Sequence, residues 1–231
     1  TLRVAGREFM VDRDWVGARD HSWGLGGDSG TGGRIAGFIA PPGGVRTPSH
    51  KPAFGMRQWS LVRLPERSIF YWFHHGRDGT MAPLKSHIGH PFEANRPGEA
   101  YRGARLESAA FAGGLRRLER AVVAFERHGG RTDRFGIEAV SRPLYMQGGG
   151  YWGGFSDGLG RGIYRGEDHV EGEIWDIAHP TRVYDLSGNP VSQRQGAWAE
   201  TFARFENLDD PAEKGLGLLE CVIAGPYRTG V

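Results

Sequence analysis

Cysteine and long apolar runs are missing or nearly so from this 231-residue chain, and each absence excludes a class of protein. Cys221 is the only cysteine, which excludes an internal disulfide framework and a cysteine-rich zinc site. No apolar run approaches the roughly 18–20 residues that cross a bilayer, so the sequence predicts no membrane span. The first residues have no basic flank followed by a long apolar core, so we expect no secretory signal and a cytoplasmic location.

A marked excess of charge of either sign is also missing. The chain has 29 basic and 27 acidic residues, a formal net charge of +2, and its many arginines are spread along the sequence. Nucleic-acid-binding surfaces gather cations and stacking aromatic rings on one face, and no such gathering is visible here. We therefore expect no nucleic acid among the partners.

Glycine, by contrast, is abundant, with 38 residues, more than twice its usual share. An interior glycine weakens a helix by about 1 kcal/mol relative to alanine, whereas tight turns and barrel corners use glycine readily. Short runs of aromatic and β-branched residues predict two hairpins, 56–64 with 68–75 and 117–127 with 134–140. Further strands are expected at 162–166, 171–176, 181–185 and 217–223. Many short strands without long helices between them predict an all-β barrel or sandwich.

The string Gly148–Gly153 formally matches the GxGxxG pattern of dinucleotide-binding proteins. Such a site needs a helix directly after the glycines, because the phosphate lies at the helix N-terminus. Gly154–Gly158 follows instead and cannot hold a helix. We interpret the string as a β-corner or loop and expect no organic cofactor.

One short stretch holds several residue types that can bind a metal ion: His74, His75, His87, His90, Asp78 and Glu93. A site on a β-scaffold could recruit such residues. Neighbouring residues of a strand point to opposite faces, however, so His74 and His75 cannot line one pocket without a bulge. We predict no metal site, keep a metal-dependent enzyme as an alternative, and consider the wall of an organic-ligand pocket a third interpretation.

The densest group of chemically active side chains lies at 14–24. On a strand, Arg19, His21 and Trp23 would share one face and Asp20 would take the other. A carboxylic acid or imidazolium at the end of an apolar cavity can protonate a C=C bond or a carbonyl, and an indole can stabilise the cation formed. Asp20 beside Arg19 is equally interpretable as a structural ion pair, and the sequence leaves both interpretations open.

The string Arg19–Gly24, RDHSWG, resembles the carotenoid 1,2-hydratase (hydroxyneurosporene synthase) and AttH-like group. The ending 217–228 fits the same pattern, and the stretch 151–176 fits it more weakly. The resemblance implies a lipocalin-like antiparallel β-barrel, the second of two consecutive barrels in that group. It therefore implies junction strands of a first barrel at 1–25 and a lipocalin-like barrel domain at 26–231.

The resemblance further implies chemistry on a hydrophobic small molecule without a cofactor. Our leading hypothesis is a lyase or isomerase that hydrates, dehydrates or cyclises its substrate by acid catalysis in a barrel cavity. Asp20 would be the general acid and His21 its partner or a base. Residues expected to contact the substrate are Arg19, Trp23, Trp72, His74, Tyr151 and Trp152.

Two other functions remain open at this point. The first is a non-catalytic lipocalin-like binding protein for hydrophobic ligands, and the second is the metal-dependent enzyme.

A homodimer, or a separate chain that supplies the first barrel, is the expected protein partner, because an incomplete two-barrel unit would expose apolar edge surface.

Overall fold

A computed structural model of the chain describes residues 1–12, 15–18, 55–76, 84–112, 117–145, 166–170, 172, 175–176, 183–185, 190–192 and 196–224. Within these ranges the regular structure is β-strand apart from one short 3-10 helix, η1 (Phe92–Ala94). The strands are β1 (Leu2–Val4), β2 (Arg7–Phe9), β3 (Met56–Arg63), β4 (Ser68–His75), β5 (Lys85–Gly89), β6 (Tyr101–Ala112), β7 (Arg117–Arg127), β8 (Thr132–Ala139), β9 (Leu144–Tyr145), β10 (Trp175–Asp176), β11 (Val183–Asp185), β12 (Pro190–Ser192), β13 (Gly196–Asn207) and β14 (Lys214–Ala224).

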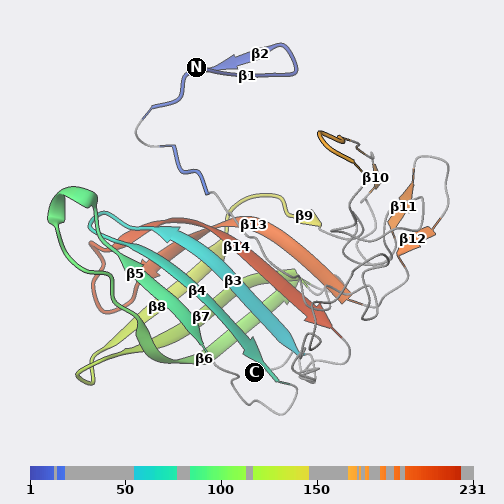
Figure 1. Cartoon of the computed structure of the whole chain (residues 1–231). Coiled ribbons are helices and arrows are strands. Elements are labelled where there is room, and N and C mark those ends of the chain that lie inside the picture. The colour runs from blue at the N-terminus through green and yellow to red at the C-terminus, as the bar shows by residue number, and fades with distance from the viewer. Residues whose placement is uncertain are drawn as a thin grey trace, which may run out of the picture.

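The large sheet has the strand order β5-β4-β3-β14-β13-β8-β7-β6, and β9 pairs with β13 beside it (Figure 1). All of these pairings are antiparallel. The sheet curls, and its edge strands approach each other through a bridge between Ile88 and Glu99, with N–H to O distances of 2.7 and 3.0 Å. The backbone N–H of Tyr101 also donates to Ser86 Oγ at 2.9 Å. The prediction of an all-β, lipocalin-like fold is therefore confirmed.

Both predicted hairpins are present, because β3 pairs with β4 and β7 pairs with β8. The second turn depends on Gly129 and Gly130, which have positive φ angles of 89° and 83°. Glycine adopts this backbone conformation at no steric cost. The turn is closed by the N–H of Arg127, which donates to the carbonyl of Arg131 at 2.8 Å.

The later strand predictions are confirmed in part. The run 217–223 lies within β14, and 181–185 contains β11. The predicted pairing of 162–166 with 171–176 falls mostly outside the described residues. The part that is described, β10, pairs with β11 in a separate three-stranded sheet that also contains β12.

The interior of the curled sheet is a packed core. Side chains alternate between the two faces of each strand, so β3 and β4 bury every second residue. Eleven large side chains on the inner face are less than 2% exposed: Tyr71, Phe73, Phe125, Phe135, Phe205, Met56, Ile88, Leu118, Leu219, Gln58 and Val123. Each buried apolar side chain contributes about 1.5–3 kcal/mol to folding. These eleven side chains are therefore covered by other protein atoms over almost all of their surface.

Two glycines let β14 approach β3 closely. A Cβ atom on Gly215 would lie 1.9 Å from the carbonyl oxygen of Arg63, and one on Gly217 would lie 2.5 Å from that of Leu61. No side chain fits at such distances. This corner of the barrel therefore depends on glycine at both positions.

The N-terminal strands β1 and β2 form their own two-stranded sheet (Figure 1). Arg3 Nε contacts Glu8 Oε2 at 2.8 Å across this hairpin, and all the residues of both strands are exposed. The assignment of 1–25 to the junction of a first barrel stays a prediction. No helix in the described ranges is long and apolar enough to cross a membrane.

Candidate functional site

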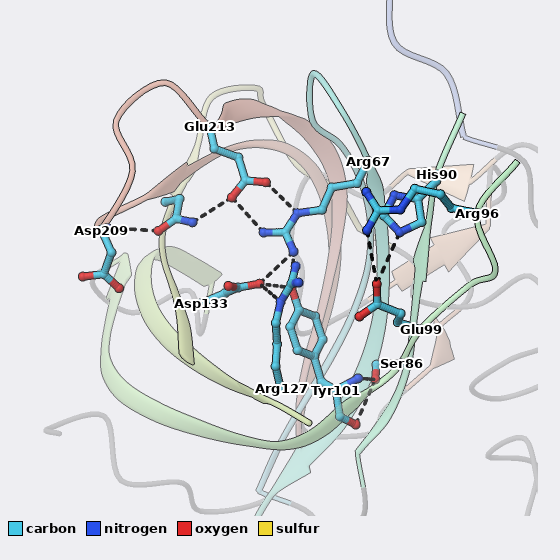
Figure 2. Close-up of polar contacts among 11 residues, drawn as sticks. Arg67, Ser86, His90, Arg96, Glu99, Tyr101, Arg127, Asp133, Asp209 and Glu213 are labelled. Carbon is cyan, nitrogen blue, oxygen red and sulfur yellow. Dashed lines mark hydrogen bonds and ion pairs between the residues drawn. The ribbon is translucent and has the colours of Figure 1, made fainter. Parts of the chain in front are cut away.

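One end of the barrel is closed by a buried ionic cluster, shown in Figure 2. Arg67 donates from Nε and Nη2 to the two oxygens of Glu213 at 2.5 and 2.7 Å, and from Nη1 to Asp133 Oδ2 at 2.8 Å. Arg127 Nε and the hydroxyl of Tyr101 donate to the same Asp133 oxygen, each at 2.9 Å. The Arg67 and Asp133 side chains are only 7% and 6% exposed. We refer to these five residues as the closed-end cluster.

The electrostatics of the closed-end cluster fit a structural role. Burial lowers the pKa of Arg67, but its hydrogen bond to Glu213 and the charge of Asp133 outweigh this, and the net shift is upward. Burial raises the pKa of Tyr101, so its hydroxyl stays protonated and donates. Two guanidinium groups thus face two carboxylates, and every charge has an opposite charge as its partner.

A second group of polar side chains lies on the outer face of the same sheet, where four neighbouring strands bring it together. Across β13, β14, β3 and β4, the strand registers align Glu200, Glu220, Trp59 and Trp72 in one row. In the next row Arg57 on β3 lies opposite His74 on β4. We define the outer-face site as these six residues: Arg57, Trp59, Trp72, His74, Glu200 and Glu220.

Trp72 and His74, both predicted to contact substrate, are half-buried on the outer face of β4 and contact each other. The Trp72 indole N–H donates to His74 Nε2 at 3.0 Å, which places the proton of a neutral imidazole on Nδ1. Burial and the positive charge of Arg57 lower the pKa of His74. Lys85 Nζ lies 4.7 Å from the centre of the Trp72 ring. His75 points to the inner face, so the prediction that the two histidines lie on opposite faces is confirmed.

Glu200 and Glu220 lie directly opposite each other on β13 and β14. Glu220 forms an ion pair with Arg57 in which the Arg57 and Glu220 side chains are 22% and 11% exposed. Burial and the charge of Glu220 raise the pKa of Glu200, and Arg57 lowers it by a smaller amount. The pair therefore combines a carboxyl group that is ion-paired with arginine and one whose pKa is raised by burial and by its neighbour's charge.

An apolar row borders the charged one on the same face. Phe202, Leu218, Leu61 and Phe70 lie side by side across β13, β14, β3 and β4. Phe202 is 41% exposed, and the Phe70 ring packs edge-on against Trp59 with 5.8 Å between centroids. The outer-face site thus has a polar part with acid–base groups and an apolar part that an uncharged molecule could cover.

The inner face of the same strands carries His75 and a few other polar side chains among the core residues. Tyr71 donates from its hydroxyl to Gln58 Oε1 at 3.1 Å, and Ser60 donates to the Leu218 carbonyl at 2.6 Å. Burial, together with the charge of Glu220, raises the pKa of the Cys221 thiol to about 12. A thiol with that pKa is almost entirely protonated at neutral pH and is a weak nucleophile.

Six of the predicted site residues lie outside the described part of the chain: Arg19, Asp20, His21, Trp23, Tyr151 and Trp152. Their roles stay predictions.

The histidine stretch holds no metal-binding group within the described ranges, which exclude Asp78: nowhere there do three His, Cys, Asp or Glu side chains come together. His87 is exposed on β5 and adjoins Gly98, where a Cβ would lie 2.2 Å from the imidazole. His90 Nε2 lies 3.5 Å from Glu99 Oε1.

Sequence reasoning missed Arg57, Trp59, Glu200 and Glu220. Two of them could have been found from the sequence. Glu200 lies within an alternating run, and Glu220 lies within a predicted strand of otherwise apolar residues. Pairing 196–207 with 214–224 as a hairpin would have placed the two carboxyl groups side by side.

A family model described as "Family of unknown function (DUF8625)" matches residues 1–230 of the chain. No curated protein matches the sequence.

Proposed function

The chain belongs to the DUF8625 family, and we propose that it is a cofactor-independent lyase or isomerase that acts on an apolar small molecule by acid catalysis at the outer-face site. The observation that carries the proposal is the row of Glu200, Glu220, Trp59 and Trp72 on one half-buried face. Acid–base groups next to an apolar surface are what proton transfer to an alkene or a carbonyl requires.

This site differs from the barrel cavity expected from the sequence. The inner face of β3, β4 and β14 carries fully buried side chains such as Tyr71, Phe73 and Leu219, which belong to the packed core. The outer face instead has partly exposed apolar and polar groups on the same strands. We therefore assign substrate binding to the outer face of the described strands.

The predicted roles of Asp20 as general acid and His21 as its partner remain part of the proposal as a possible second source of acid–base groups. The resemblance of their string to the carotenoid 1,2-hydratase and AttH-like group supports an isoprenoid-like or polyketide-like substrate. The metal-dependent alternative has no support from the described residues, which bring no metal-binding group together.

A second copy of the chain is the protein partner that we propose. The β1–β2 hairpin and the residues after it expose five large apolar side chains, with exposed fractions of 37–76%: Leu2, Val4, Phe9, Met10 and Val11. Exposed apolar surface of this kind marks contacts between chains. Light scattering on a size-exclusion column tests it: a monomeric mass at micromolar concentration would contradict a homodimer.

The proposed activity is testable with geranylacetone, an apolar isoprenoid ketone that carries both alkenes and a carbonyl. In deuterated buffer without added metal or cofactor, we expect it to bind, measured by tryptophan fluorescence, and to gain carbon-bound deuterium, measured by mass spectrometry. Replacement of an aromatic wall, Trp59→Leu or Trp72→Leu, should weaken binding about tenfold, since a loss of about 1.4 kcal/mol corresponds to that factor.

Trp15→Leu is the matched control, because Trp15 is 43% exposed and lies outside the outer-face site. Binding without deuterium uptake would favour the non-catalytic lipocalin-like binding protein. An absence of binding, or an equal loss of affinity in all three variants, would contradict the proposal.

A further inference from the structure

We propose that Glu200 is the proton donor of the outer-face site and that Arg57 keeps its neighbour Glu220 ionised, an inference that rests on the proposed function. The first argument is register. Residues directly opposite in an antiparallel pair have Cβ atoms about 4.5–5.5 Å apart, and Glu200 and Glu220 are such a pair. Two carboxylates this close repel each other, so one of them favours its protonated form.

The second argument is the asymmetry between the two carboxyl groups. Glu220 accepts a hydrogen bond from Arg57 Nη2 and is 9% exposed as a residue, so its negative charge is matched. Glu200 has no hydrogen bond or ion pair to any residue in the described part of the chain. The carboxyl group that binds the arginine is therefore that of Glu220, and the proton of the pair belongs on Glu200.

The groups that face Glu200 agree with this assignment. From β14 the facing charge is that of Glu220, and from β3 it is that of Arg57. On the other side, β9 places the apolar residue Leu144 opposite Glu200. On β13 itself Arg204 is four residues away and its Nη1 is 3.1 Å from Glu138 Oε2, so its charge is already matched. Burial and the charge of Glu220 raise the pKa of Glu200 in consequence.

The other titratable groups of the outer-face site are poorer donors. Glu220 is already engaged in its ion pair with Arg57. His74 accepts the indole N–H of Trp72 at Nε2 and its pKa is lowered, so it is neutral at neutral pH. A neutral carboxylic acid is a far stronger acid than a neutral imidazole, whose remaining N–H is not released near neutral pH. Glu200 is thus the strongest neutral acid in the site.

The chemical step balances without an oxidant or a reductant. The O–H bond of Glu200 breaks and its electron pair stays on the carboxylate, while the proton forms a C–H bond to an alkene carbon or an O–H bond to a carbonyl oxygen. In an isomerisation, the resulting cation loses a neighbouring proton to the Glu200 carboxylate. In a hydration, the cation gains a water molecule, which then gives a proton to the same carboxylate. Both routes restore neutral Glu200.

The test uses the full chain, geranylacetone as the probe, and two measurements. In a pH series of difference infrared spectra, wild-type protein against Glu200→Gln, the carbonyl band of a neutral carboxylic acid should disappear at a pH above 4.5, the ordinary pKa of glutamate. The rate of deuterium uptake by geranylacetone should fall about 100-fold or more in Glu200→Gln, the usual contribution of a general acid. Glu206→Gln is the matched control, because Glu206 is an exposed residue on the same face of β13.

Glu220→Gln tests the positioning role separately. It removes the neighbouring negative charge, so the infrared band and the deuterium uptake should disappear at a lower pH than in wild-type protein, with the fold retained. A purely structural role for Glu220 would not move the pH profile.

Each result decides one proposal. Unchanged deuterium uptake in Glu200→Gln, or a carbonyl band of Glu200 that disappears at or below pH 4.5, would overturn the assignment of the donor while leaving the proposed function standing. No deuterium uptake in wild-type protein would overturn the proposed function, and the catalytic role of Glu200 with it, whatever the infrared spectrum contains.

Discussion

The closed-end cluster and the outer-face site use the same residue types on the same sheet, yet they differ in charge balance. At the closed end two arginines, Arg67 and Arg127, face two carboxylates. In the outer-face site one arginine, Arg57, faces the two carboxyl groups of the Glu200–Glu220 pair. Balanced charges with full hydrogen bonding stabilise a fold, whereas a surplus carboxyl group costs stability and is available for proton transfer.

The largest effect is expected at the closed end. Arg67→Met would leave Glu213 and Asp133 without their shared guanidinium, and removing one partner of a buried ion pair typically costs about 3–5 kcal/mol. Urea unfolding measures the change in the free energy of unfolding. The control is Arg102→Met, because Arg102 and Glu126 form a pair whose side chains are 65% and 51% exposed. Removing that pair should cost less than about 1 kcal/mol. Equal losses in both variants would contradict a structural role for the closed-end cluster.

A smaller loss is expected at the corner where β14 meets β3, next to the closed end. Gly215→Ala would force a methyl group to within 1.9 Å of the Arg63 carbonyl oxygen unless the strands separate. Overpacking of this kind costs about 1–3 kcal/mol. Gly17→Ala is the control, since no atom lies within 4 Å of a Cβ at Gly17. A Gly215→Ala protein as stable as the control, in the same urea experiment, would mean that the two strands can part without penalty.

The smallest change in stability is expected at the outer-face site, where the substitution should stabilise the protein, in contrast to the two substitutions above. The pKa of Glu200 in the folded protein lies above its ordinary value of 4.5, so the folded state holds this proton more tightly than the unfolded chain. The resulting stabilisation is complete below pH about 4.5 and is lost as the pH rises through the folded-state pKa. Glu200→Gln should therefore be more stable than wild-type protein at pH 7, by less than about 1 kcal/mol because the carboxyl is only half-buried.

Thermal unfolding between pH 4 and pH 8 measures this difference. The gain of Glu200→Gln over wild-type protein should shrink towards pH 4, where both side chains are neutral. Glu206→Gln, at an exposed position of the same strand, is the control for the loss of a carboxyl group. A Glu200→Gln protein that loses stability at neutral pH would place Glu200 with the structural charges of the closed end.

Local patterns predicted the sheet well, because each hairpin depends on neighbouring residues. The runs at 56–64 and 68–75 and the glycines at 129–130 carry their strand and turn signals within a few positions. The 181–185 and 217–223 runs became β11 and β14 for the same reason.

The sites depend on register between strands far apart in the sequence, which local patterns do not contain. Arg57 and Glu220 are 163 positions apart, and Arg67 and Glu213 are 146 apart. Only the pairing of β14 with β3 brings these charges into contact. Trp72 and His74 lie two positions apart on one strand, so the strand period alone predicts that they share a face.

The barrel has a seam where β5 approaches the chain just before β6. There the backbones meet at one bridge, Ile88 with Glu99, in contrast to the eleven aligned pairs that join β13 to β14. Separating β5 from the chain before β6 breaks few hydrogen bonds, so the barrel can open locally at this point while the other strands stay paired. Exchange of backbone amide hydrogens with solvent should consequently be faster along β5 than along β14.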